Sequence, residues 1–266
     1  IGDWNHHTSL LSPTEIIIYQ NQYIYATTMG GLLEFEIERS EFQFIKNPTL
    51  RYSDLNTMII DNNADLLLGG NYPKGSIQIF DQNLGLTNNI DHLEGVDKII
   101  KISLQYPILF AIYSSNNSFG VLKLQYNEED VLEYLDFFNN FPNEVSNITD
   151  IDIFEDNIYI TTSNNIIKGN FINDNLKSSD NWEIISLPTD MPLVFHISET
   201  NYYVGGYNEF WKYNGTDWQT INLEIDPNFG SDYTVLDIIE GNDNSIGILT
   251  EKQYYQIQNN DNIFYE

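Results

Sequence analysis

A repeated pattern of short apolar segments constrains the fold of this chain more than any other feature. In each copy, one apolar segment leads through a polar turn to a second, and a third segment, rich in aromatic residues, follows another turn. The first copy comprises Ile16 to Tyr19, Tyr23 to Thr28 and Leu32 to Ile37. Six copies are present, and their second segments end 42 to 49 residues apart, at Thr28, Gly70, Tyr113, Thr162, Gly206 and Thr250.

This spacing is typical of a β-propeller, in which a blade of four antiparallel strands takes about 40 to 50 residues. Helical repeats of similar length would show apolar residues at i, i+3 and i+4, and that pattern is absent here. The apolar segments are short, rich in Ile, Tyr, Phe and Thr, and separated by Asn, Asp and Gly clusters. The sequence therefore predicts an all-β chain, a β-propeller of about six four-stranded antiparallel blades with almost no helix.

The repeat also predicts the domain organisation. We expect a single propeller domain over 1–266, with Gly or Thr closing several second strands where neighbouring sheets converge. Trp4 lies in segment 1–13, which we expect to be a closing strand that completes the blade ending near Tyr265. The alternative is that the chain is part of a larger propeller. The expected blades are 14–54, 55–95, 96–146, 147–190, 191–227 and 228–266.

Charge and composition exclude several classes of function. The chain has 11 basic and 39 acidic residues, a net charge of −28, and only two arginines, Arg39 and Arg51. Binding to nucleic-acid phosphates requires clustered Lys and Arg, so we expect no nucleic-acid partner. Cysteine is absent, which excludes disulfides and thiolate chemistry. Apolar segments are far shorter than the roughly 20 residues of a membrane helix, so we expect no membrane insertion.

Two stretches resemble known propeller families. Trp211-Lys-Tyr-Asn-Gly-Thr-Asp-Trp218 resembles the turn motif of two-component-regulator type propeller repeats, with Asn214-Gly215 forming a turn between two Trp-bearing strands. Gly205-Gly206 followed by Tyr213 and Trp218 is similar to the order of a kelch repeat.

The first 95 residues resemble the opening of PorZ-like propellers of the type IX secretion system. The resemblance rests on Ile1-Gly-Asp-Trp-Asn-His-His, on Ile24-Tyr-Ala-Thr-Thr-Met-Gly-Gly-Leu-Leu33, and on Leu84-Gly-Leu-Thr-Asn88. It implies a periplasmic or cell-surface protein of Bacteroidota-like bacteria that acts in sorting or attaching secreted cargo.

Metal and catalytic sites are not indicated by the motifs. His6 and His7 adjoin on an expected strand and point to opposite faces, and His92 and His196 are isolated, so we interpret all four as structural or solvent-exposed. Asp61-x-Asn63-x-Asp65 alternates like a calcium loop but lacks its Gly and Glu, which favours a polar hairpin turn. Asp150 and Asp152 share one face of a strand, where we expect a solvated pair; the alternative is a cation bound in the channel. We expect no metal and no cofactor.

No catalytic constellation is apparent, because nucleophile elbows, phosphate-binding loops and sialidase-type boxes are all missing. We therefore expect a non-catalytic binding or scaffold module whose partner is a protein or a cell-surface glycan or lipid. Two alternatives remain open. One is a glycosidase or lyase that uses channel carboxylates, and the other is the sensor domain of a hybrid signalling kinase.

The expected binding residues are aromatic and cationic groups in loops at one face, between second and third strands and between blades. An anionic glycan or lipid head group would suit Arg51 and Lys74, and a protein segment is the other option. The complete predicted set is Arg51, Tyr52, Tyr72, Lys74, Tyr207 and Asn208.

Overall fold

The computed structural model forms two compact units, which are described separately. The first is Ile1–Ile102 with Tyr113–Ser118, and the second is Ser103–Ile112 with Phe119–Glu266. The residues described are 13–19, 22–36, 38–39, 41–45, 50–71, 74–81, 85–116, 118–142, 145–189, 192–198, 201–223, 232–240, 245–251, 254–258 and 262–265. The expected closing strand with Trp4 lies outside them.

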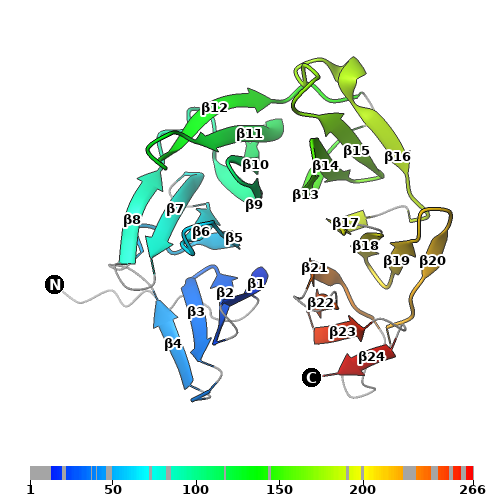
Figure 1. Ribbon diagram of the computed structural model, residues 1–266, viewed down its shortest axis with the longest axis horizontal. Coiled ribbons are helices and arrows are strands. Elements are labelled where there is room, and N and C mark those ends of the chain that lie inside the picture. The colour runs from blue at the N-terminus through cyan, green and yellow to red at the C-terminus, as the bar shows by residue number, and fades with distance from the viewer. Residues whose placement is uncertain are drawn as a thin grey trace. The chain divides into compact units, whose positions relative to one another are not determined.

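Six four-stranded sheets are present, and in each of them consecutive strands are hydrogen-bonded neighbours (Figure 1). The first two sheets contain β1 (Glu15–Tyr19), β2 (Tyr23–Thr28), β3 (Gly31–Glu36) and β4 (Glu41–Ile45), then β5 (Leu55–Ile60), β6 (Leu66–Gly70), β7 (Ser76–Asp81) and β8 (Gly85–Ile90). The third contains β9 (Lys98–Gln105), β10 (Ile108–Ser115), β11 (Ser118–Tyr126) and β12 (Leu132–Phe138).

The remaining three sheets belong to the second unit. They contain β13 (Ile148–Phe154), β14 (Asn157–Thr162), β15 (Asn165–Asn170) and β16 (Glu183–Ser186), then β17 (Pro192–Ile197), β18 (Tyr202–Gly206), β19 (Phe210–Tyr213) and β20 (Trp218–Thr220), and finally β21 (Val235–Glu240), β22 (Ile246–Thr250), β23 (Tyr254–Gln258) and β24 (Asn262–Tyr265). The described residues contain one helical element, the 3-10 turn Ser179–Asn181. The prediction of a six-bladed β-propeller with almost no helix is confirmed.

The second strand of a blade is buried on both faces, which explains its composition. All five residues of β6 are buried, and so are five of the six in β14. A Cβ on Gly69 would lie 2.5 Å from Cγ2 of Thr57 and 2.7 Å from Cγ2 of Ile99, on the first strand of the next sheet. Gly205 is equally crowded, because its Cβ would lie 2.5 Å from Cγ1 of Val235. Close approach of the sheets therefore requires glycine here, as the sequence predicted.

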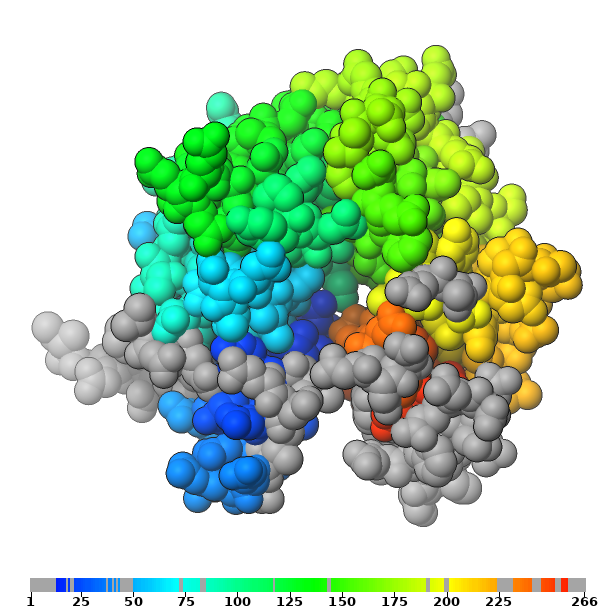
Figure 2. Space-filling model, viewed as in Figure 1, coloured from blue at the N-terminus to red at the C-terminus, as the bar shows by residue number. Residues whose placement is uncertain are grey.

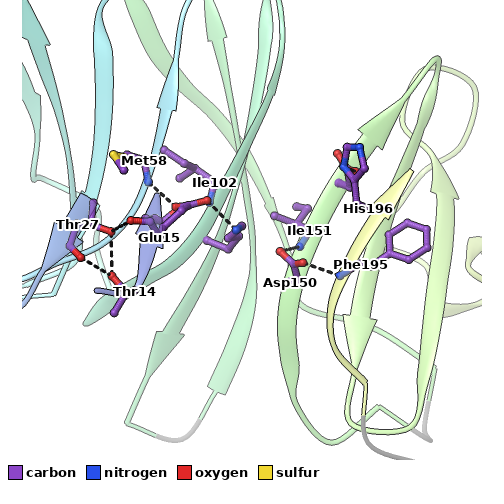
Figure 3. Close-up of polar contacts among 12 residues, drawn as sticks. Thr14, Glu15, Thr27, Met58, Ile102, Asp150, Ile151, Phe195 and His196 are labelled. Carbon is purple, nitrogen blue, oxygen red and sulfur yellow. Dashed lines mark hydrogen bonds and ion pairs between the residues drawn. The ribbon is translucent and has the colours of Figure 1, made fainter. Parts of the chain in front are cut away.

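Side chains on the first strands connect consecutive blades through the backbone (Figure 3). Oε2 of the buried Glu15 on β1 accepts the N–H of Met58 on β5 at 2.6 Å. Thr57 then offers its Oγ1 to the N–H of Ile102 on β9 at 3.1 Å. In the second unit, Oδ2 of Asp150 on β13 accepts the N–H of Phe195 on β17 at 2.8 Å (Figure 3). Each bond satisfies a buried backbone donor in the following blade.

A β-bulge precedes two of these acceptors, Thr57 and Asp150. The register shifts just before Thr57, Asp150, Val194 and Asp237, so each of these residues follows an extra residue in the first strand. Bulges bend the strand and re-aim side chains. The acceptors are therefore turned by the backbone toward the neighbouring blade.

Apolar side chains of consecutive blades pack together around these polar bonds. Figure 2 shows the chain as a space-filling model in the view of Figure 1. In the first unit, one core cluster includes Tyr25 and Leu32 together with Leu55 and Met58 of the next sheet. In the second unit, Phe210 of β19 packs in one cluster with Val235 and Tyr255 of the last sheet. Burying each such side chain stabilises the fold by about 1.5–3 kcal/mol. The first two blades therefore share one core, and so do the last two.

We predict that Asp150→Ala lowers the free energy of unfolding by about 1–3 kcal/mol, because the N–H of Phe195 is then buried without an acceptor. Chemical denaturation measures the change. The matched control is Asp174→Ala in an exposed turn, which we expect to stay within about 0.5 kcal/mol of the parent. Equal effects of the two substitutions would contradict the role given to Asp150.

We also predict that Gly69→Ala destabilises the protein by about 1–3 kcal/mol through overpacking against Thr57 and Ile99. Thr57→Ser removes the Cγ2 atom that clashes and keeps the hydroxyl that binds Ile102. A double-mutant cycle should therefore show part of the loss restored in the combined variant. Strictly additive effects would mean that the close approach is not what requires glycine.

Candidate functional site

Arg51 and Tyr52 form a rigid pair in the connection between the first two blades. Nη2 of Arg51 lies 2.8 Å from Oδ2 of Asp91, and its Nε donates to the hydroxyl of Tyr52 at 3.1 Å. The Tyr52 hydroxyl donates in turn to Oδ2 of Asp91 at 3.0 Å. The side chain of Arg51 is half exposed, so this cluster reaches the surface with its charge already balanced by Asp91.

The side chain of Gln78, which is fully buried on β7, forms hydrogen bonds with the backbone of both residues. Its Oε1 accepts both the N–H of Arg51 at 2.8 Å and that of Tyr52 at 3.0 Å. Its Nε2 donates to the carbonyl of Tyr52 at 2.9 Å. One buried side chain therefore satisfies three polar groups of the connection, which orders it before any ligand arrives.

The other two predicted binding residues of the first unit are Lys74 and Tyr72. Lys74 is exposed in the connection between β6 and β7. Tyr72 lies outside the described residues, so its place in a binding site stays a prediction. The structure brings Arg51 and Tyr52 together with Asp91, a partner that the sequence did not indicate.

Tyr207 and Asn208 lie in the second unit, between β18 and β19. Tyr207 is 54% exposed, although its backbone forms a β-bridge with Thr234. Asn208 donates its N–H to the carbonyl of Tyr233 at 2.8 Å, and its Oδ1 accepts the N–H of Tyr233 at 2.7 Å. Its φ of 56° is a left-handed conformation that Asn tolerates better than most residues. Asn208 therefore holds the loop, and Tyr207 is displayed on it.

A cluster that the sequence analysis did not identify lies on the first strands of three consecutive blades. His196 on β17 places Nδ1 3.1 Å from Oδ2 of Asp152 on β13 and Nε2 3.6 Å from Oε2 of Glu240 on β21. The side chain of His196 is 19% exposed. Asp152 also accepts the N–H of Ile197 at 3.0 Å.

These contacts correct the interpretation of Asp150 and Asp152 as a solvated pair. Asp150 is only 2% exposed and accepts backbone donors from Ile151 and Phe195, while Asp152 pairs with His196. The interpretation was wrong because a carboxylate on a first strand can reach the next blade. The sequence does carry a signal, since Asp152, His196 and Glu240 are each 44 residues apart, one blade repeat.

The electrostatics of the cluster favour a charged imidazole. Burial by itself lowers the pKa of His196, but the hydrogen bond and charge of Asp152 and the charge of Glu240 outweigh it and raise that pKa above its ordinary value. The position of Asp152 fixes the proton on Nδ1 and orients the ring.

The remaining sequence motifs have structural roles in the described residues. Oδ1 of Asp61 accepts the N–H groups of Asn63 and Asp65 at 2.8 and 2.9 Å, which confirms a hairpin turn. His92 is almost fully exposed beside Asp91, whereas His6 and His7 lie outside the described residues. Within the described ranges, no group of three His, Asp or Glu side chains is arranged to hold a metal ion, and no helix is long and apolar enough to cross a membrane.

Comparison with known proteins identifies solved structures with a similar fold. No protein-family model matches the chain, and no curated protein matches it either. Solved structures do match, and they include a streptogramin B lyase structure at 13% identity and TM-score 0.65, covering 97% of this chain and 84% of that one.

Two surface-associated proteins are also similar. PorZ, described as an essential surface component of the type-IX secretion system of Porphyromonas gingivalis, matches at 15% identity and TM-score 0.66 over 100% of this chain and 34% of its own. The extracellular domain of the putative one-component system BT4673 from B. thetaiotaomicron matches at 14% identity and TM-score 0.63, covering 98% of this chain and 34% of its own. The chain thus spans about a third of these two proteins.

These likenesses establish architecture and not activity, because they join an enzyme, a secretion component and a signalling ectodomain at 13 to 15% identity. The chain is a six-bladed β-propeller, similar in fold to the solved structures of PorZ, of the BT4673 extracellular domain and of streptogramin B lyase.

Proposed function

We propose that this chain is a non-catalytic binding module that recognises a protein partner through the loops joining second to third strands and joining blades. The observation that carries the proposal is Tyr207, more than half exposed on a backbone that Asn208 and Thr234 hold in place. Exposed Tyr and Arg on ordered backbone are the groups that dominate protein interfaces, because little entropy is lost when they bind.

Charge supports a protein partner over an anionic head group. The guanidinium of Arg51 is already paired with Asp91, so Arg51 and Tyr52 present matched donors and acceptors instead of a free positive charge. The net charge of −28 favours partners that carry a basic surface, since complementary charge speeds association. On this proposal, Lys74 lies at the solvent-exposed edge of the interface and contributes little to the binding energy.

Export is the second part of the proposal. PorZ is described as a surface component, and the similar parts of BT4673 are extracellular domains. A strongly acidic chain, with a net charge of −28, suits a periplasmic or cell-surface site. We therefore place the module outside the cytoplasm, as part of a larger secretion or signalling assembly.

Site-specific photo-crosslinking in the source cells tests the binding proposal. A benzoylphenylalanine replaces Tyr207 in the full-length protein at its native expression level, and the matched control replaces Tyr134, which is 45% exposed on β12. We predict a discrete protein adduct at position 207 that is absent at position 134. Tyr207→Ser should then reduce co-purification of the adducted protein at least tenfold, in line with the cost of removing a central anchor.

Equal adducts at both positions, or none at position 207, would overturn the assignment of this loop. An adduct that carries glycan instead of protein would replace the protein partner with a glycan. Arg51→Ala in the same cells tests the first unit, and we expect it to weaken the complex less than Tyr207→Ser because Asp91 already pairs with Arg51.

A propeller enzyme is the second candidate, favoured by the Asp152, His196 and Glu240 cluster and by the likeness to a streptogramin B lyase. A histidine paired with a carboxylate is a common general acid or base. On the binding proposal, the purified protein leaves a type B streptogramin unchanged in mass-spectrometric assays at pH 6 to 9. Conversion that disappears in His196→Asn would establish the enzyme instead.

A further inference from the structure

We propose that His196 is a pH-responsive tie that holds three consecutive blades together when it is protonated and loosens when it loses its proton. The tie joins β13, β17 and β21 through the two carboxylates on either side of the ring. It concerns the cohesion of the second unit, and it stands whether or not the binding role of Tyr207 is correct.

The geometry supports a proton as the charge that holds the cluster. Asp152 lies on the Nδ1 side of the ring and Glu240 on the Nε2 side, so no single cation could contact all three side chains. Nε2 is buried and makes no hydrogen bond, although Glu240 is 3.6 Å away. A neutral ring would present a lone pair or an unpaired N–H to this carboxylate, whereas an imidazolium donates toward both acids.

The surroundings of His196 contain few other ionisable groups among the described residues. Asp152 faces it from β13 and Glu240 from β21. On β18, Tyr203 is the register partner of His196, and on β14, Tyr159 stacks on Phe195 instead. The two acids therefore control the ring, and Asp152 is fixed by the N–H groups of Ile153 and Ile197.

Cohesion of the blades should follow the charge of the ring. With a neutral His196 the cluster carries two negative charges, and with an imidazolium it carries one, so proton loss increases repulsion between β13 and β21. The first strand β21 also begins beside Thr234, which bridges to Tyr207. The tie therefore includes both blades that are linked by the bridge between Tyr207 and Thr234.

The sign of the pH dependence follows from the raised pKa. Protonated His196 is stabilised in the folded chain, so its contribution is fully present below the unfolded pKa of about 6.5 and is lost as pH rises through the folded value. Each unit of difference between the two pKa values corresponds to a tenfold change in the folding equilibrium constant.

NMR titration of the imidazole protons of His196 is the first measurement. We expect His196 to titrate above the ordinary imidazole value of 6.5, and Glu240→Gln to lower its midpoint. The second measurement is the folding equilibrium constant of the parent and of His196→Asn from pH 5.5 to 9. We expect the advantage of the parent to be largest at pH 5.5 and to decrease as the pH rises to 9.

Two results would overturn the proposal. One is a midpoint for His196 at or below the ordinary value of 6.5, and the other is a parallel pH dependence of the parent and of His196→Asn. If His196→Asn does not fold, the titrations of the parent and of Glu240→Gln decide alone, and an unchanged midpoint in Glu240→Gln would refute the tie.

Discussion

The packing of one blade on the next depends on a buried side chain that accepts a backbone N–H across the gap between two sheets. Glu15, Thr57 and Asp150 each do this from a first strand, and each donor lies 43 to 45 residues later in the chain. A sheet binds its own strands through its ladder, but hydrophobic contact alone lets two sheets slide over each other. A side-chain acceptor that bonds one particular N–H fixes the position of one sheet on the next, because a buried unpaired donor costs about 1–3 kcal/mol. Glu15 is itself neutralised by Lys101, whose Nζ lies 2.7 Å from Oε1, so the charge that binds Met58 is not left alone.

The same design explains why binding residues can be held still. The connection with Arg51 and Tyr52 is fixed by the buried amide of Gln78, and the loop with Tyr207 is fixed by Asn208. In both places a polar side chain satisfies backbone groups that a loop would otherwise leave to water. The loops therefore combine variable exposed side chains with an ordered backbone, which is the property that a recognition surface needs. Asn208 was predicted as a binding residue, and its observed contacts give it a positioning role in the loop.

The sequence predicted the fold well because a propeller repeats one short-range pattern. Strand length, β-branched composition and turn residues are local properties, and so is the crowding at Gly69 and Gly205 that forbids a side chain. The cluster of Asp152, His196 and Glu240 escaped prediction because His196 and Glu240 look isolated in the sequence and Asp152 looks paired with Asp150. Their common spacing of 44 residues places them at neighbouring points of consecutive blades, so superposing the repeats would have revealed them. The partnership of Arg51 with Asp91, 40 residues later, has no such periodic signal beyond the blade length itself.

Amide hydrogen exchange at the donor residues tests the central claim most directly. If side-chain acceptors fix consecutive blades, the N–H groups of Met58, Ile102 and Phe195 exchange only through global unfolding, as slowly as the N–H groups within the central strands. Their protection should far exceed that of the exposed turn at Asp174. Exchange of Met58 and Phe195 at the rate of that turn, while the strand ladders stay protected, would show that the sheets are held together by apolar packing alone and would contradict this account.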